Sequence, residues 1–210
     1  MNYGTCVSWL SVLATTTANI FSAPPYGFTW DKLGLIWISP MIGSLIGAYF
    51  CGPLNDWFTL FLSKRNRGFR EPEYRLWASM PSAIILPAGL IIYGVTSAHG
   101  FHWIVPIIGM ALVGFGLSVA GAVTMSYILD CYPLLDTQVV TTIILIRNLV
   151  GFGITWGIQP WITSMGQQTT FICVGALSFA VTVFALFFII FGKSLRRWTA
   201  SKYLRLAKTL

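Results

Sequence analysis

The chain has 210 residues, of which 56% are hydrophobic and only 9% are charged, and its mean hydropathy is +0.74. Soluble domains carry about 25% charged residues, because their surfaces must face water. Thirteen basic and six acidic side chains are too few to solvate a globule of this length. The composition therefore excludes a soluble enzyme, a nucleic-acid-binding protein and a disordered chain, and it predicts an integral membrane protein.

The charge-free stretches predict where the chain crosses the bilayer. Residues 1–30, 33–55, 76–129 and 148–192 contain no charged side chain. A transmembrane helix needs about 20 mostly apolar residues, so each of the two longest stretches holds two helices with a turn between them. The sequence predicts one unit, residues 1–192, of six transmembrane helices at about 1–21, 33–53, 76–97, 102–129, 138–163 and 168–192.

The basic residues predict the orientation of these helices. Five lie in the predicted loop 54–75 and six in the predicted tail 193–210, which together are eleven of the thirteen. Six spans place both segments on one side, and cytoplasmic segments collect Lys and Arg. We therefore expect both termini to be cytoplasmic. The net charge of +7 then reflects topology, and the tail can contact anionic membrane lipid without any nucleic-acid partner.

No motif for a catalytic group, a metal or a cofactor is present in the sequence. The four cysteines, Cys6, Cys51, Cys131 and Cys173, have no CxxC spacing. There is no HExxH or GxSxG motif, and the two histidines share a short turn that contains no acid. An intramembrane enzyme needs a nucleophile with a base, paired carboxylates or a metal cluster, so we expect no enzymatic activity.

Four segments of the sequence follow patterns of a known membrane-protein family. The residues Gly52-Pro53-Leu54-Asn55-Asp56 follow the pattern G-x-x-x-D, and Trp57 comes next. This segment resembles part of the signature loop between helices 8 and 9 of the major facilitator superfamily, in which Arg is usual at the position of Trp57. The segment 64–76 is similar to the central loop of fungal members grouped with drug:proton antiporters. Residues 126–133 and 147–153 also fit. The resemblance covers essentially the whole chain, aligned to the C-terminal six helices.

The resemblance implies a fold and a function. It implies an all-α membrane protein in which six helices form two inverted three-helix repeats, half of a twelve-helix fold. It implies transport of a small-molecule substrate across the plasma membrane by alternating access, against an N-terminal six-helix half or a second copy of the chain. The alternative is a six-helix membrane protein that does not transport and has a structural or regulatory role.

Polar residues within two predicted spans are candidates for a substrate cavity. On the fifth span, polar residues recur at spacings of seven, seven and four, which places them in one stripe along a helix. They are Thr141, Asn148, Thr155 and Gln159. The first span repeats the seven-then-four spacing. The resemblance implies that these two helices line the cavity, whereas the alternative is hydrogen bonding between helices. The cavity candidates are Asn148, Gln159, Thr155, Arg147, Ser8, Thr15 and Asn19.

Arg147 is the only charged residue well inside a predicted span. A charge at that depth costs at least about 2.5–3.5 kcal/mol on insertion scales, so it needs a partner or water. We consider two roles: contact with an anionic substrate or a gate, and a structural pair with Asp130 or Asp136.

The candidate gate lies at the end of the second span. The resemblance implies that Asp56, after Gly52, faces the N-terminus of a neighbouring helix near Thr137, where an anion is favourable by about 0.3–1 kcal/mol. Such a contact can form in one conformation and break in another. Asp130 is a further gating or proton-coupling candidate, or simply an acid at a helix end.

Small residues predict close packing between helices. They are the pair Gly43 and Gly47, the pair Gly153 and Gly157, and the stripe Ala111, Gly114, Ser118 and Ala122. The spans 76–97 and 168–192 carry few polar groups beyond Ser and Thr, so we expect them to be lipid-facing supports.

Overall fold

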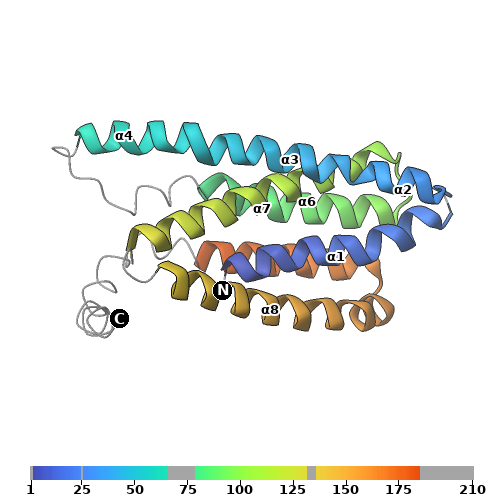
Figure 1. The fold of residues 1–210 in the computed structure, drawn as a ribbon. Coiled ribbons are helices and arrows are strands. Elements are labelled where there is room, and N and C mark those ends of the chain that lie inside the picture. Colours follow the sequence, from blue (N-terminus) through green and yellow to red (C-terminus); the bar gives the residue numbers. More distant parts are fainter. Residues whose placement is uncertain (1, 25, 66–78, 132–135, 185–210) are drawn as a thin grey trace.

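The computed structural model describes residues 2–24, 26–65, 79–131 and 136–184, and its regular elements are all helices. The helices lie side by side along roughly one direction (Figure 1). In chain order they are α1 (Asn2–Ser22), α2 (Trp30–Ile36), α3 (Ile38–Tyr49), the π-helical turn η1 (Phe50–Leu54), α4 (Asn55–Arg65), α6 (Met80–Ala98), α7 (Ile104–Cys131), α8 (Asp136–Met165) and a last helix at Gln167–Phe184.

Five stretches of the described residues are long and apolar enough to cross a membrane. They are Trp30–Phe61, Met80–Ala98, Ile104–Tyr127, Thr137–Met165 and Gln167–Phe184. The helix α1 has 21 residues, which is long enough to cross at 1.5 Å per residue, but it is not among the five. Its Ser, Thr and Asn side chains make it less apolar, so they must be buried in protein or meet water.

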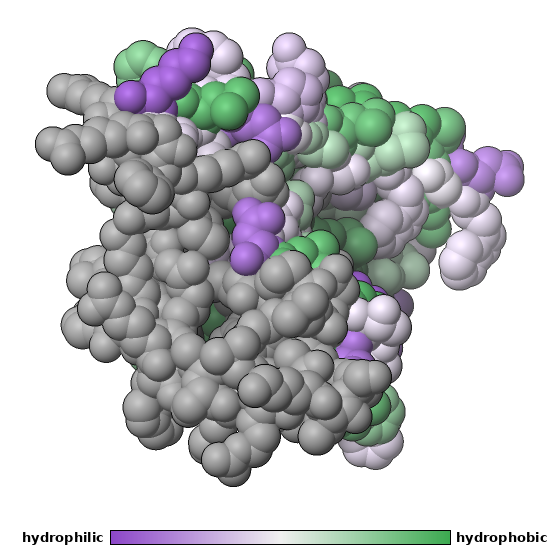
Figure 2. Space-filling view, turned by 60° about the vertical axis from the view of Figure 1, so that its left-hand side comes forward, coloured by the Kyte–Doolittle hydropathy of each residue, from purple (hydrophilic) through white to green (hydrophobic). Residues whose placement is uncertain are grey.

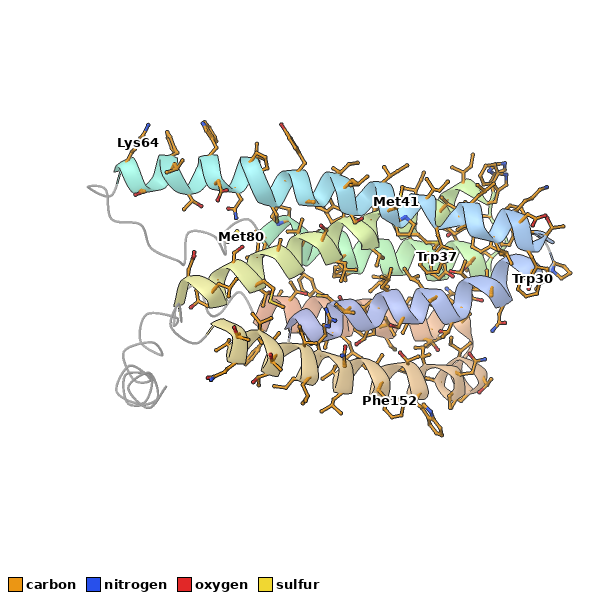
Figure 3. The ribbon with its side chains drawn as sticks, viewed as in Figure 1. Trp30, Trp37, Met41, Lys64, Met80 and Phe152 are labelled. Carbon is orange, nitrogen blue, oxygen red and sulfur yellow. The ribbon has the colours of Figure 1, made fainter. Side chains whose placement is uncertain are left out.

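The second predicted span extends further than the sequence indicated. The prediction ended it at 53 and began a loop at 54, whereas η1 and α4 continue the helix to Arg65. Pro53 has no N–H to donate, and the wider π-helical turn accommodates it without ending the helix. Trp30 and Lys64 therefore lie at opposite ends of one long helical stretch (Figure 3). The remainder of the predicted loop and tail, 66–75 and 193–210, lies outside the described residues.

The helix α7 packs closely against both α3 and α6. A Cβ atom added at Gly43 would overlap the backbone carbonyl oxygen of Ala111, and one at Gly47 would lie 2.8 Å from that of Phe115. The close helix packing predicted at Gly43 and Gly47 is thus confirmed, and the structure shows that the helix they approach is α7. A Cβ atom at Gly153 or Gly157 meets nothing within 4 Å, so this second pair packs against no described residue.

The bundle exposes many large apolar side chains. Figure 2 views the molecule from the end toward which α4 projects, and the coloured part of that face mixes green apolar groups with white and pale purple ones and several strongly purple groups. Exposed apolar side chains include Leu45 at 63% and Tyr49 at 69% on α3. Surfaces of this composition suit lipid rather than water.

The helix α6 is more than a lipid-facing support. Tyr93 on α6 is fully buried, and its ring makes an edge-to-face contact with Phe171 of the last helix, with ring centroids 5.2 Å apart. Its hydroxyl lies 3.3 Å from Thr16 Oγ1 and 3.2 Å from Thr17 Oγ1 of α1. Both threonines donate to carbonyls of α1, so the Tyr93 hydroxyl is the donor to either of them. Tyr93 thereby joins three helices, a role that the sequence analysis missed.

Tyr93→Phe is expected to lower the free energy of unfolding by about 1 kcal/mol, since interhelical hydrogen bonds in membranes contribute about 0.6–2 kcal/mol. The threonines keep their own backbone bonds, and the ring keeps its contact with Phe171. Unfolding in mixed micelles by SDS titration measures the change. Tyr49→Phe, at a side chain 69% exposed, is the matched control. Equal stability of the two variants would contradict the role given to Tyr93.

Candidate functional site

Among the five apolar stretches of the described residues, α8 is the least buried. None of its most apolar 18-residue window is buried, and Phe152 and Trp156 are 68% and 76% exposed. Phe152 points away from the other helices (Figure 3). Asn148 and Gln159 are exposed and Thr155 is half-buried. The structure therefore places the fifth-span candidates on or beside a face that no described residue covers.

The candidates on α1 occupy different environments. Thr15 and Asn19 are exposed, but Ser8 is fully buried and its hydroxyl donates to the carbonyl of Gly4 at 2.8 Å. A Cβ atom at Gly151 of α8 would lie 3.6 Å from Ser8 Oγ. Ser8 is thus part of the contact between α1 and α8, and in this structure it is not on an open face as the stripe predicted.

The two helices diverge beyond that contact and leave a pocket. Near Ser8 they pack closely, but near Asn19 and Gln159 a pocket of about 340 Å³ lies at the end of the bundle where α1, α6 and α8 end. We call this the turn pocket. It brings together two of the candidates, Asn19 and Gln159. Its other lining residues are Thr16, Ile20, Ala23, Pro24, Tyr26, Ser97, Ala98, Gly100, Ile162 and Gln167.

The remaining cavity candidate, Arg147, lies away from the turn pocket. Its side chain is half-buried, and its Cα atom would lie 3.2 Å from a Cβ atom at Gly4 of α1. Arg147 therefore stands where α8 meets the beginning of α1, next to the exposed Asn148. Its contact with a substrate, and its pairing with Asp130 or Asp136, stay predictions.

The candidate gate residues lie at the end of the bundle opposite the turn pocket. Gly52 is half-buried in η1, and Asp56 is exposed in the first turn of α4. Asp130 is exposed near the end of α7. A contact between Asp56 and the start of α8 stays a prediction. Asp56 lies on a helix, where the sequence analysis expected a loop.

Asn55 is a polar residue of this region that the sequence analysis missed. Its side chain is 5% exposed, and its Oδ1 atom has no hydrogen-bond partner among the described residues. Buried amides without a partner are costly and are common where a structure rearranges or holds a water. Its position directly before Asp56 was the only signal available in the sequence.

Tyr26 closes the turn pocket from the connection between α1 and α2. Its hydroxyl donates to the carbonyl oxygen of Phe101 at 2.7 Å, and its ring packs against Phe21 and Phe28 at centroid distances of 5.1 and 6.4 Å. Burial raises the pKa of the Tyr26 phenol, so the group stays neutral and remains a hydrogen-bond donor at physiological pH. The aromatic cluster thereby fixes one wall of the pocket.

Comparisons with known proteins identify relatives along almost the whole chain. It is 34% identical over 203 residues to an uncharacterised MFS-type transporter of Schizosaccharomyces pombe, which is 97% of this chain and 35% of that protein. It is 33% identical to protein HOL1 of Saccharomyces cerevisiae over 94% of this chain and 34% of that protein. It is 29% identical to the MFS-type transporter penM of Penicillium rubens over 92% and 38%, respectively.

These alignments cover nearly all of this chain but only part of each relative. The chain spans about a third of the length of the curated relatives that it matches. No family model and no solved structure matches it. Its apolar helices agree with a membrane location. The relatives from Schizosaccharomyces pombe and Penicillium rubens are named MFS-type transporters, and they align with 97% and 92% of this chain. HOL1 aligns with 94% of it. The chain is an integral membrane protein and a partial member of the major facilitator superfamily.

Proposed function

We propose that this chain is the C-terminal six-helix half of a carrier that moves a small solute across the plasma membrane by alternating access. The single observation that carries the proposal is the outer face of α8, which is exposed and mixes apolar side chains with Asn148 and Gln159. Two amide side chains on a purely lipid-facing helix would be unfavourable, because polar groups in hydrocarbon are costly. That face suits a helix that borders a water-filled space between two halves.

The partner of this face is an N-terminal six-helix half or a second copy of the chain. The relatives are about three times as long as the aligned region, which favours a half in the same polypeptide. In the proposed architecture, α1, α2–α4 and α6 form one three-helix repeat, and α7, α8 and the last helix form its inverted counterpart. Both termini are proposed to be cytoplasmic, because the basic residues gather at 54–75 and 193–210 and cytoplasmic segments collect Lys and Arg.

An immunoblot of native membranes tests whether the gene product is longer than this chain. An antibody against residues 193–210 is expected to detect a band near or above twice 23.2 kDa. A band at 23.2 kDa would contradict a half fused to its partner. It would favour a dimer of this chain or the alternative, a six-helix protein that does not transport, and crosslinking would separate those two.

Asn148→Ala and Gln159→Ala in the full-length protein are expected to reduce transport. A transported solute is first found by comparing the metabolite content of cells with and without the gene. Each variant is then expected to lower kcat/KM for uptake of that solute at least fivefold, since each removes a polar contact worth about 1 kcal/mol. Gln138→Ala, at an exposed amide nearer the start of α8, is the matched control. Unchanged uptake in both Asn148→Ala and Gln159→Ala would contradict the cavity assignment.

A further inference from the structure

A line of buried residues continues from α3 through the π-helical turn η1 into α4. Gly47 of α3 faces α7, because a Cβ atom there would lie 2.8 Å from the carbonyl oxygen of Phe115. Cys51 of η1 also faces α7, and its thiol donates to the carbonyl oxygen of Val119 at 3.6 Å. The next residues at the same interval of four are buried as well, namely Asn55, Thr59 and Ser63 of α4. One side of the helical stretch is therefore buried on both sides of η1.

This line depends on the π turn. Each residue of an α-helix turns by about 100°, so a step of four residues drifts by about 40°. Between Gly47 and Ser63 the drift of a continuous α-helix reaches about 160°, which would place the two residues on nearly opposite sides. A π turn holds one residue more than an α turn and removes about 100° of that drift. The wider turn thus keeps the line of α4 on the side that α3 buries.

The line that η1 keeps buried is polar, whereas the adjacent line of α4 is apolar. The Oδ1 atom of Asn55 has no hydrogen-bond partner among the described residues, and Thr59 Oγ1 donates to the backbone carbonyl of Asn55 at 2.8 Å. One position earlier along the helix, residues 54, 58 and 62 are Leu, Phe and Leu. The sequence of α4 therefore carries two lines, one residue apart, and the apolar one needs no hydrogen-bond partner.

We propose that η1 is a two-state hinge that rotates α4 about its own axis. A change of η1 from a π turn to an α turn, with the same residues, turns α4 by one residue, about 100°. Each position of α4 then takes the direction that the next residue has now. Asn55 moves to the direction in which Asp56 is now exposed. Positions 54, 58 and 62 take the place of the buried polar line.

Opposing costs keep both states of the hinge accessible. The π state buries an amide oxygen without a partner, which is unfavourable. The α state restores a clash between the ring of Pro53 and the carbonyl four residues earlier. Asp56 turns with α4, so a contact of its carboxylate with the start of α8 fits only one of the two states. That consequence for the gate rests on the proposed function, whereas the rotation itself does not.

Thr59→Cys reports the rotation. Thr59 is fully buried, and in the α state it would take the direction of Leu60, which is exposed. The matched control is Thr182→Cys, because Thr182 is also buried and its hydroxyl also donates at 2.8 Å to the carbonyl four residues earlier. In the purified full-length protein, with all native cysteines replaced by alanine, Thr59→Cys is expected to react with N-ethylmaleimide at least tenfold faster than Thr182→Cys. Equal rates would overturn the hinge.

Two changes at Pro53 distinguish rotation from local unfolding. Pro53→Ala removes the ring and keeps the number of residues, so it favours the α state and is expected to raise the rate at Thr59→Cys at least threefold. Deletion of Pro53 removes the ring and the additional residue together. An α turn then forms with α4 in its present direction, and the same rate is expected to fall at least tenfold. Rates that change in the same direction in both variants would contradict the rotation.

Leu60→Cys is the folding control for both changes at Pro53. Leu60 is exposed, and in the α state it would take the direction of Phe61, which is exposed to a similar extent. Its rate is therefore expected to change less than twofold in either variant. Should the deletion variant not fold, Pro53→Ala still decides, because an unchanged or lower rate at Thr59→Cys in that variant overturns the hinge by itself.

The hinge and the carrier function can fail separately, because the reaction rates are measured without any solute. Solute uptake that depends on Asn148 and Gln159, combined with equal rates for Thr59→Cys and Thr182→Cys, would leave the carrier function standing and overturn the hinge. Opposite responses to the two changes at Pro53, without any solute uptake, would leave the hinge standing and contradict the carrier function.

Discussion

Gly43→Val is expected to reduce the yield of folded protein at least tenfold. The Cβ atom of any other residue at this position would overlap the carbonyl oxygen of Ala111 in α7. The neighbouring atom belongs to a helix backbone, so it cannot move aside as a flexible side chain would. Overpacking of well-packed interiors costs about 1–3 kcal/mol or more, and here the two helices would have to separate along their whole contact.

Detergent-solubilised protein, measured as the monodisperse peak in size-exclusion chromatography, reports this loss. Gly34→Val is the matched control, because Gly34 is also helical, is exposed, and has nothing within 4 Å of its added Cβ atom. Gly43→Ala is expected to fall between the two, since it adds one methyl group to the same contact. Similar yields for Gly43→Val and Gly34→Val would contradict the close approach of α3 and α7.

The helices and one of their contacts could be predicted from the sequence, because both depend on local features. Charge-free stretches long enough to cross a bilayer indicated where helices form. The spacing of Gly43 and Gly47, and of Ala111 and its neighbours, indicated small faces that pack together. The end of the second span was placed too early because the charge-free stretch ends at residue 55, whereas η1 and α4 carry the helix past Pro53 to Arg65.

The pocket could not be predicted, because it depends on how two helices diverge. Periodicity placed Ser8 and Asn19 on the same face of α1, and in the structure both lie on the side of α1 that faces α8. It could not reveal that α8 contacts α1 at Ser8 and has separated from it at Asn19. Tyr93 was missed for a related reason. A lone tyrosine in an apolar span gives no signal until Thr16 and Thr17 of another helix are known to lie within hydrogen-bond distance.

The exposed face of α8 can contact either lipid or a water-filled cavity. The rate at which a cysteine on this face reacts with a thiol reagent differs between the two environments. The thiolate is the nucleophile, and apolar surroundings keep a cysteine in its inert thiol form. A membrane-impermeant reagent also needs water to reach its target. Leu149 on α8 and Leu45 on α3 are each 63% exposed in the described structure, so they form a matched pair for this comparison.

Leu149→Cys in the full-length protein is expected to react with a cationic methanethiosulfonate reagent at least a hundredfold faster than Leu45→Cys. All native cysteines of the full-length protein, including the four of this chain, are first replaced by alanine, and modification is followed by a shift in electrophoretic mobility. Both residues lie in apolar stretches that can cross a membrane. Leu149 neighbours Asn148 on the face that we propose borders the cavity, whereas Leu45 lies among the exposed Ile42, Ile46 and Tyr49 of α3. If Leu149→Cys is as unreactive as Leu45→Cys, α8 faces lipid, and the proposal that its amides contact a transported solute is wrong.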